Sequence, residues 1–324
     1  MATNPADNRP RPEPGGLCSR FSIEVGEQLA GTAPLARAWV VVEQPGAYGR
    51  DALVESYLPA DVARHVSSFK ADGQVRPLLV RRNAGRAHRG ERSLAAGGPQ
   101  IRRAWWCRAD PGSAALWSLP FTDPQELLAL DLAKLAAGRP DLVHPDAVPD
   151  PEPMLLVCTN GARDRCCAIR TRPIAAALFA DPDRAERVWE CSHLGGHRFA
   201  PTAVQLPHGW VHGRLDLTTA CQVLDAARRG QLALETARGW SALNPPAQAA
   251  DLAVRRQFGL DTLDGLDVKQ STGDPNEWLV FAPGHEPARV RVFSEPVRAH
   301  PDSCGSDPTL DEQWKAEILT LPAC

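Results

Sequence analysis

Residues 154–167 read MLLVCTNGARDRCC, an apolar run that leads directly into a polar loop and then into two adjacent cysteines. The apolar residues that end at Cys158 predict a buried strand, because a short apolar run followed by turn residues is typical of a sheet interior. A rigid strand end can aim the Cys158 thiolate into the loop, and Cys167 follows after eight intervening residues. This stretch therefore predicts a sheet protein whose chemistry lies where a strand ends.

A second cluster, CSHLGGH at residues 191–197, supplies His193 and His197. The two glycines between the histidines allow the backbone to fold tightly, so that both imidazoles can converge. Together with Cys158 and Cys167 they make a set of two thiolates and two imidazoles. Such a set suits Zn²⁺, or a [2Fe–2S] cluster in which two histidines replace two cysteines. The residues alone leave both metals open.

The elements predicted from apolar periodicity and turn residues fall into two halves, each with the order β-α-β-β-β-α. That is the element order of a thioredoxin-like layer, so we interpret the chain as a degenerate duplication. The first half has predicted strands at 38–44, 76–82, 101–107 and 116–119, and helices at 59–71 and 123–137. The second has strands at 154–158, 188–191, 204–206 and 210–215, and helices at 172–179 and 218–229. Beyond them we expect a helix at 246–258 and strands at 278–282, 289–293 and 313–319.

The predicted fold class is α/β, with an α+β arrangement as the alternative. It consists of two thioredoxin-like halves and a C-terminal α/β extension. We expect a disordered, proline-rich N-terminus at residues 1–16, a first half at 17–150, a ferredoxin half with the Cys₂His₂ site at 151–235, and the extension at 236–324.

The composition narrows the class of protein. The chain has 324 residues, 43% of them hydrophobic, and a net charge of −3, which gives no general reason to expect nucleic acid or an anionic membrane. No apolar run approaches the roughly 20 residues of a membrane span, and the N-terminus lacks the apolar core of a signal peptide. We therefore expect a cytoplasmic protein. In that reducing compartment, nine cysteines argue for metal or redox chemistry rather than for a disulfide framework. Glycine-rich nucleotide-binding motifs are absent from the sequence.

The remaining cysteines are expected to be structural. Cys191 lies on a predicted strand and is expected in the core, and Cys166 is interpreted as a bystander beside Cys167. A further five are scattered along the chain and are each expected to be small buried apolar residues: Cys18, Cys107, Cys221, Cys304 and Cys324.

Two other features compete for a functional role. His208 and His212 repeat the HxxxH spacing, but they lie in a predicted hairpin and are expected to be exposed. Between residues 76 and 108 there are nine arginines and one acidic residue, so this segment could dock an acidic redox partner or could simply be a solvated loop. The arginines are at positions 76, 81, 82, 86, 89, 92, 102, 103 and 108.

The stretch MLLVCTNGARDRCC, followed by CSHLGGHRFAPTAV, resembles the sucrase/ferredoxin-like family, the thioredoxin-like ferredoxins. CSRFSIEVGEQLAGTA and AWVVVEQPGAYGRDAL are similar to the N-terminal half of that family, and RGWSALNPPAQAADL and SCG to its tail. The resemblance thus spans residues 17–305. It implies a [2Fe–2S] cluster held by a Cys-x₈-Cys pair and an HxxxH pair, which places the ligands at Cys158, Cys167, His193 and His197. Cys166 and the FAPTAV segment depart from the family pattern.

The resemblance implies a cytoplasmic electron carrier rather than a catalyst. Its thiolates would hold one iron and its imidazoles the other, with a Rieske-like potential above that of all-cysteine ferredoxins and with reduction coupled to proton uptake. An unidentified redox partner, such as a flavin reductase, is implied. No carboxylate pair supports a glycosidase. The alternatives are a thiol–disulfide oxidoreductase acting through Cys166–Cys167 or Cys158, and an interaction module stapled by zinc.

Overall fold

The computed structural model describes residues 16–82, 100–110, 112 and 115–320. Residues 1–15, which include nearly all of the segment predicted to be disordered, lie outside this range. So do Cys324 and three of the arginines considered above, Arg86, Arg89 and Arg92.

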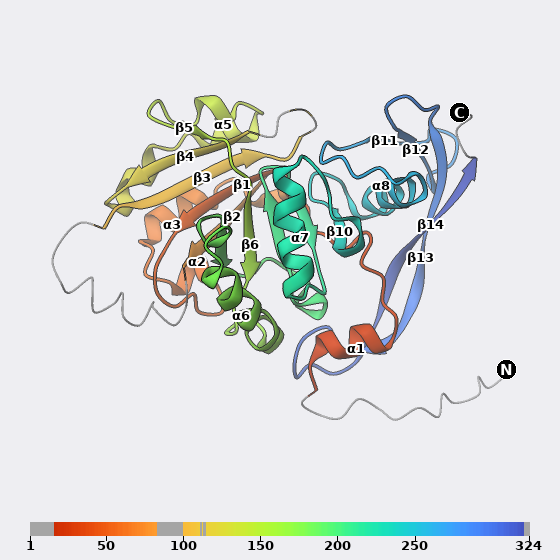
Figure 1. Ribbon diagram of the computed structural model, residues 1–324, viewed down its shortest axis with the longest axis horizontal. Coiled ribbons are helices and arrows are strands. Elements are labelled where there is room, and N and C mark those ends of the chain that lie inside the picture. Colours follow the sequence, from red (N-terminus) through yellow and green to blue (C-terminus); the bar gives the residue numbers. More distant parts are fainter. Residues whose placement is uncertain (1–15, 83–99, 111, 113–114, 321–324) are drawn as a thin grey trace.

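A mixed sheet of ten strands forms the centre of the molecule, in the spatial order β10-β9-β8-β6-β7-β2-β1-β3-β4-β5 (Figure 1). A separate sheet has the order β11-β12-β13-β14. The large sheet contains β1 (Ala38–Glu43), β2 (Val75–Arg81), β3 (Arg102–Arg108), β4 (Leu116–Phe121), β5 (Val148–Asp150), β6 (Met154–Cys158), β7 (Val188–Cys191), β8 (Ala203–Leu206), β9 (Trp210–His212) and β10 (Ala237–Trp240). The small sheet contains β11 (Asp267–Gln270), β12 (Glu277–Phe281), β13 (Ala288–His300) and β14 (Thr309–Thr320). The predicted α/β class is confirmed.

The large sheet contains the same arrangement twice. Strand β1 is parallel to β2 and antiparallel to β3, which is antiparallel to β4. In the same way β6 is parallel to β7 and antiparallel to β8, which is antiparallel to β9. The two sets join through the antiparallel pair β2–β7, where Val80 lies opposite Cys191 and Arg81 opposite Glu190. This repeated strand order is the two-fold thioredoxin-like arrangement that the element order predicted.

Alternate strand residues fill two different cores, as the two-residue period of a strand requires. Val40 and Val42 pack into a core with Leu127 and Leu135 from the helical segments of the first half. On the opposite face a second core spans both halves, because it contains Trp39 of β1 together with Leu156, Cys158 and Cys167. Two of the predicted ligands therefore lie at the edge of a continuous apolar core.

Helices cover the sheets (Figure 1). They are α1 (Cys18–Glu24), α2 (Ala52–Glu55), α3 (Ala60–Val66), α5 (Leu132–Ala136), α6 (Arg165–Ala180), α7 (Leu217–Arg228) and α8 (Pro245–Phe258). Helices α6 and α7 pack on the second half, where Leu178 and Leu224 share a core with Leu155 and Val157 of β6. None of the helices in the described part of the chain is long and apolar enough to span a bilayer.

Four predicted helices differ from the structure, and the first of them, predicted at 59–71, is the shorter α3, which ends at Val66. The helix predicted at 123–137 is a 3-10 helix, Pro124–Ala129, followed by α5, because Leu130 is extended and Asp131 caps a new start by accepting a bond from the Lys134 N–H. Helix α6 begins at Arg165 rather than at Arg172, since Asp164 caps it. Pro173 then lies inside the helix. Because proline has no N–H, the carbonyl of Ile169 receives no helical hydrogen bond, and Ile169 is exposed. Helix α7 is capped by Asp216 rather than by Thr218.

The C-terminal extension reaches back to the N-terminus. Strands β13 and β14 form a long hairpin whose tip, residues 301–308, lies beside α1 (Figure 1). Near this tip, the imidazole Nε2 of His300 lies 3.1 Å from the Oε2 atom of Glu27. The hairpin thus brings Cys304, far along the chain, to the first helix and to the start of α6.

Candidate metal centre

The four predicted ligands come from neighbouring chain segments. Cys158 is the last residue of β6, and Cys167 lies in the first turn of α6. His193 follows β7 by two residues, and His197 begins a short 3-10 turn. Because β6 and β7 are adjacent and parallel, their carboxyl ends meet at one edge of the sheet, which is where ligands bind in α/β sheets.

The structure brings three of these residues together directly. The two sulfur atoms of Cys158 and Cys167 and a ring nitrogen of His193 all lie within 4.8 Å of one another. His197 does not belong to this group, although its ring centroid is 5.5 Å from that of His193. Its Nε2 atom instead lies 3.7 Å from the Oδ2 atom of Asp164. The site is therefore a compact trio with a second imidazole beside it.

The histidine loop is held by two arginines, of which Arg238 is fully buried and Arg76 is half-buried. Gly195 and Gly196 both have positive φ, at +106° and +69°, so the loop needs glycine at these positions. Arg76 Nη2 donates to the carbonyl of Leu194 at 2.8 Å, and Arg238 Nη1 donates to that of Gly195 at 3.0 Å. A Cβ atom added to Gly196 would collide with the Arg238 guanidinium. These contacts fix where the two imidazoles leave the backbone.

The cysteine loop is shaped by its own polar side chains. Asn160 Oδ1 accepts a bond from the Arg163 N–H at 3.3 Å, and Asp164 Oδ1 accepts one from the Cys166 N–H at 2.8 Å. Asp164 thereby caps α6 and places Cys167 in its first turn. The positive end of the helix dipole favours a thiolate there.

The thiols at this site share one negative charge. Hydrogen bonds from the thiols of Cys167 and Cys191 hold the pKa of Cys158 well below its usual range, against the opposing effect of burial. The pKa of Cys167 is raised, because its proton is engaged by Cys158 and because it is buried. Burial lowers the pKa of His197, so its imidazole is neutral near pH 7. One thiolate and a neutral imidazole are the protonation states that metal binding requires.

The hydrogen bonding of the histidine ring nitrogens indicates whether these residues suit a metal. Nδ1 of His193 and both ring nitrogens of His197 are buried and have no hydrogen-bond partner among the residues that the structure describes. A buried polar atom without a partner costs about 1–3 kcal/mol, so such atoms mark a strained or ligand-binding position. Two thiols and two such imidazoles fit a borderline-soft metal centre, either zinc or a [2Fe–2S] cluster.

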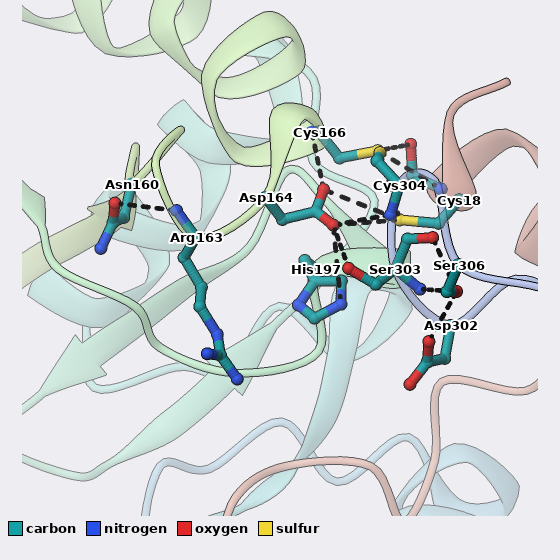
Figure 2. Close-up of polar contacts among 11 residues, drawn as sticks. Cys18, Asn160, Arg163, Asp164, Cys166, His197, Asp302, Ser303, Cys304 and Ser306 are labelled. Atoms are coloured by element: carbon teal, nitrogen blue, oxygen red, sulfur yellow. Dashed lines mark hydrogen bonds and ion pairs between the residues drawn. The ribbon is translucent and has the colours of Figure 1, made fainter. Parts of the chain in front are cut away.

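A second cluster, which the sequence interpretation missed, lies next to His197 (Figure 2). It consists of Cys18, Cys166, Cys304 and Asp164, whose ligand atoms lie within 4.8 Å of one another. Cys18 is buried as expected, whereas Cys304 is only half-buried, and both lie next to Cys166 rather than apart from other cysteines. Cys18 and Cys304 are 148 and 138 residues from Cys166 in the sequence, so no spacing pattern pointed to this group. We refer to Cys18, Cys166 and Cys304 as the three-thiol cluster.

Charge in the three-thiol cluster is concentrated on Cys166. A hydrogen bond from the Cys18 thiol, followed by bonds from Ser19, lowers the pKa of Cys166 to about 6 in spite of burial. The pKa of Cys18 is correspondingly raised, and burial raises the pKa of Cys304 to about 12. Cys166 is therefore the thiolate that its neighbours surround.

The other histidines and cysteines considered from the sequence, where the structure describes them, belong to neither cluster. His212 is fully buried, not exposed as predicted, because it faces the core from β9 and its Nδ1 lies 2.9 Å from Thr236 Oγ1. Burial lowers its pKa to about 3. Neither His208 nor His212 belongs to a metal-ligand group among the described residues. Cys107 and Cys191 are buried in the core as expected.

Most of the described arginines in the proposed docking segment are already engaged. Arg81 pairs with Glu190, Arg82 with Glu186 and Arg108 with Asp110. Arg76 instead lines a pocket beside His193, together with Arg50, Lys70, Asp51 and Arg163. Among the described residues, the positive charge next to the centre comes from this pocket.

Comparison with known proteins gives one match. The model of the sucrase/ferredoxin-like family matches residues 29–239. That range contains Cys158, Cys167, His193 and His197, and it excludes Cys18 and Cys304. No curated protein and no solved structure matches the chain.

Proposed function

Because the chain belongs to the sucrase/ferredoxin-like family, we propose that it is an electron-transfer protein carrying one [2Fe–2S] cluster. Its ligands would be Cys158, Cys167, His193 and His197. The observation that carries this proposal is the meeting of Cys158, Cys167 and His193 within 4.8 Å, beside the unpartnered nitrogens of His197.

The arrangement of the four residues supports two metal ions over one. A single tetrahedral zinc ion with bonds of about 2.0–2.3 Å would need all four ligand atoms within about 4 Å of one another. His197 lies outside the 4.8 Å group, and its ring is nearer to Asp164 and His193. A pair of thiolates on one iron and a pair of imidazoles on the other accommodates this wider spread.

When bound, the cluster would accept and return one electron, with a potential raised by its histidine ligands. The chain's own residues would set the surroundings. Arg76 and Arg238 place positive charge under the histidine loop, which favours the more negative, reduced state. Cys158 and Cys167 are completely shielded from water, whereas His193 and His197 are partly exposed. The proton coupling implied by the histidines stays a prediction, to be checked from the pH dependence of the midpoint potential.

The exposure of the histidine side suggests where a partner would dock. The pocket beside His193 is lined by four cationic side chains and one acid, Asp51. A redox partner such as a flavin reductase would approach with an acidic surface, since opposite charges speed and orient encounter. The cations are Arg50, Lys70, Arg76 and Arg163.

The experiment is anaerobic purification followed by measurement of iron, acid-labile sulfide and zinc, with EPR after dithionite reduction. We expect iron and sulfide in equal amounts and the spectrum of a reduced [2Fe–2S] centre. His193→Cys and His197→Cys should each retain a cluster but lower its midpoint potential, whereas the matched control His208→Cys should change neither. Iron and sulfide at background levels, with zinc lost on replacing Cys158, would instead identify the zinc-stapled module.

The thiol–disulfide alternative through Cys166 and Cys167 finds less support. These adjacent residues point into different clusters, Cys167 toward Cys158 and Cys166 toward Cys18 and Cys304. A reactive pair would need both sulfur atoms to face each other.

A further inference from the structure

Three cysteines from distant parts of the chain converge at the start of α6 (Figure 2). The Cys166 sulfur lies 3.4 Å from that of Cys18 and 3.1 Å from that of Cys304, and the Cys304 and Cys18 sulfurs are 3.7 Å apart. The Asp164 carboxylate completes the group, with its oxygens 3.8 and 3.9 Å from the Cys18 sulfur. Each of the three sulfurs contacts the other two. A disulfide would join only two of them and leave the third thiol without a role.

The spacing of these atoms fits a single tetrahedral ion. With zinc–sulfur bonds of about 2.3 Å, sulfurs on one tetrahedral zinc lie about 3.8 Å apart. The observed separations of 3.1–3.7 Å reach that value with shifts of a few tenths of an ångström in side-chain position. A carboxylate oxygen is an accepted fourth ligand for zinc.

The surroundings resemble a prepared ligand shell. Asp164 Oδ2 accepts bonds from Ser303 Oγ at 2.9 Å and from the Cys304 N–H at 2.8 Å, while its Oδ1 accepts the Cys166 N–H. The Ser19 N–H donates to the Cys166 sulfur at 3.5 Å. Ligating groups in metal sites are commonly oriented by hydrogen bonds of this kind. Cys304 is partly exposed, which leaves a path for an ion to enter.

We propose that Cys18, Cys166, Cys304 and Asp164 bind a zinc ion, at a site separate from the cluster centre. Binding would release the remaining thiol protons and needs no change of oxidation state. The ion would tie together the start of α1, the first turn of α6 and the tip of the β13–β14 hairpin. Helix α1 has only seven residues, fewer than a helix needs for stability in isolation, and the hairpin tip at 301–308 lies between strands.

The site lies next to the cluster centre but shares no ligand with it, and the C-terminal hairpin reaches it. Cys166 precedes the proposed cluster ligand Cys167, and Asp164 lies 3.7 Å from His197. A zinc ion on Asp164 and Cys166 would hold the first turn of α6 in place. The C-terminal extension would thus supply Cys304 as one ligand of a structural zinc site.

The test measures zinc, iron and sulfide in the anaerobically purified full chain. We expect about one zinc per chain in the wild type. The double variant Cys18→Ser/Cys304→Ser should lose zinc at least tenfold and keep its iron and sulfide. Cys107→Ser and Cys221→Ser, which replace cysteines outside the cluster, should keep both metals. Zinc at background levels in the wild type, or zinc retained by the double variant, would overturn the proposal.

The ligands can be identified without any variant, which covers the case in which the double variant does not fold. Zinc-edge X-ray absorption of the wild type should show three sulfur ligands and one oxygen. Two sulfurs and two nitrogens would place the zinc at Cys158, Cys167, His193 and His197, and would refute both this proposal and the iron–sulfur function. Iron and sulfide without zinc, or a disulfide among the three cysteines found by mass spectrometry, would refute the zinc site and leave the cluster intact.

Discussion

Replacing Gly196 by alanine should destabilise the protein far more than the same change at a glycine of equal backbone conformation. Gly196 has φ +69° and Gly259, at the end of α8, has φ +65°, so both replacements impose the left-handed penalty of roughly 1 kcal/mol. The sites differ in what a new Cβ meets. At Gly259 nothing lies within 4 Å, whereas at Gly196 the Cβ collides with the guanidinium of Arg238.

Arg238 cannot move aside cheaply, because it is fully buried and its guanidinium is bonded on three sides. Its Nε donates to Thr32 Oγ1 at 3.0 Å, its Nη1 to the Gly195 carbonyl at 3.0 Å, and its Nη2 to the Thr32 carbonyl. Losing one or two such charged hydrogen bonds costs about 1.5–3 kcal/mol each. We therefore expect Gly196→Ala to cost about 2.5–7 kcal/mol and Gly259→Ala about 1 kcal/mol.

The assay is urea unfolding of the two variants and the wild type, with iron content measured on the same samples. Gly196→Ala should also lower the iron content, since Arg238 holds the loop that carries His193 and His197. Adding Arg238→Ala should remove most of the extra cost of Gly196→Ala, as a double-mutant cycle would reveal. Equal unfolding free energies for the two glycine variants would refute the idea that Arg238 fixes the histidine loop.

Two further predictions follow from charges near the centre. Burial raises the pKa of Glu27, but the bond from His300 and the charge of Arg198 outweigh it, so that pKa is lowered, and the bond to Glu27 raises the pKa of His300. The contribution of Glu27 to the free energy of unfolding is therefore lost as pH falls through its lowered pKa. The contribution of His300 is lost as pH rises through its pKa, which lies above 6.5. In urea titrations the stabilisation from the pair should be greatest between about pH 4.5 and 6.5. His300→Gln should remove the alkaline decline, and an unchanged profile would contradict this assignment. Arg76→Gln should lower the midpoint potential by the equivalent of about 1 kcal/mol, because it removes a positive charge that favours the reduced state. Arg82→Gln should leave the potential unchanged, because the charge of Arg82 is paired with Glu186. Equal shifts of the two variants in redox titrations would refute a local effect of Arg76.

Local patterns predicted the strands of the large sheet well. The apolar runs before Glu43, Arg81, Cys158 and Cys191 became strands with nearly the predicted bounds, because a buried strand is encoded by its own residues. Helix boundaries were less predictable. The apolar periodicity predicted other starting points for the helices that begin after Asp131 and Asp164. Each helix instead begins where the aspartate side chain accepts a hydrogen bond from a backbone N–H of the first turn.

Contacts between distant segments could not be predicted in this way. The adjacent cysteines at 166 and 167 look equivalent in the sequence, yet they are about 100° apart around α6 and face different neighbours. The contact of Cys166 with Cys304 depends on the β13–β14 hairpin, which lies in the C-terminal extension, far along the chain from α6. Likewise, the burial of His212 depends on how β9 pairs with β8 and β10, which the HxxxH spacing does not encode.

The repeated topology explains why the described groups of possible metal ligands gather at one end of the large sheet, although that sheet contains two similar halves. By strand order β1 corresponds to β6 and β2 to β7, but β2 and β7 are antiparallel, so the carboxyl ends of the two parallel pairs lie at opposite edges of the sheet. At one edge β6 ends in Cys158 and β7 leads to His193. At the other, β1 ends in Glu43 and β2 in Arg81, which is paired with Glu190. A charged ion pair at the equivalent strand end supplies no soft ligand, so in the part of the chain that the structure describes the groups of possible metal ligands lie at the end of β6 and β7.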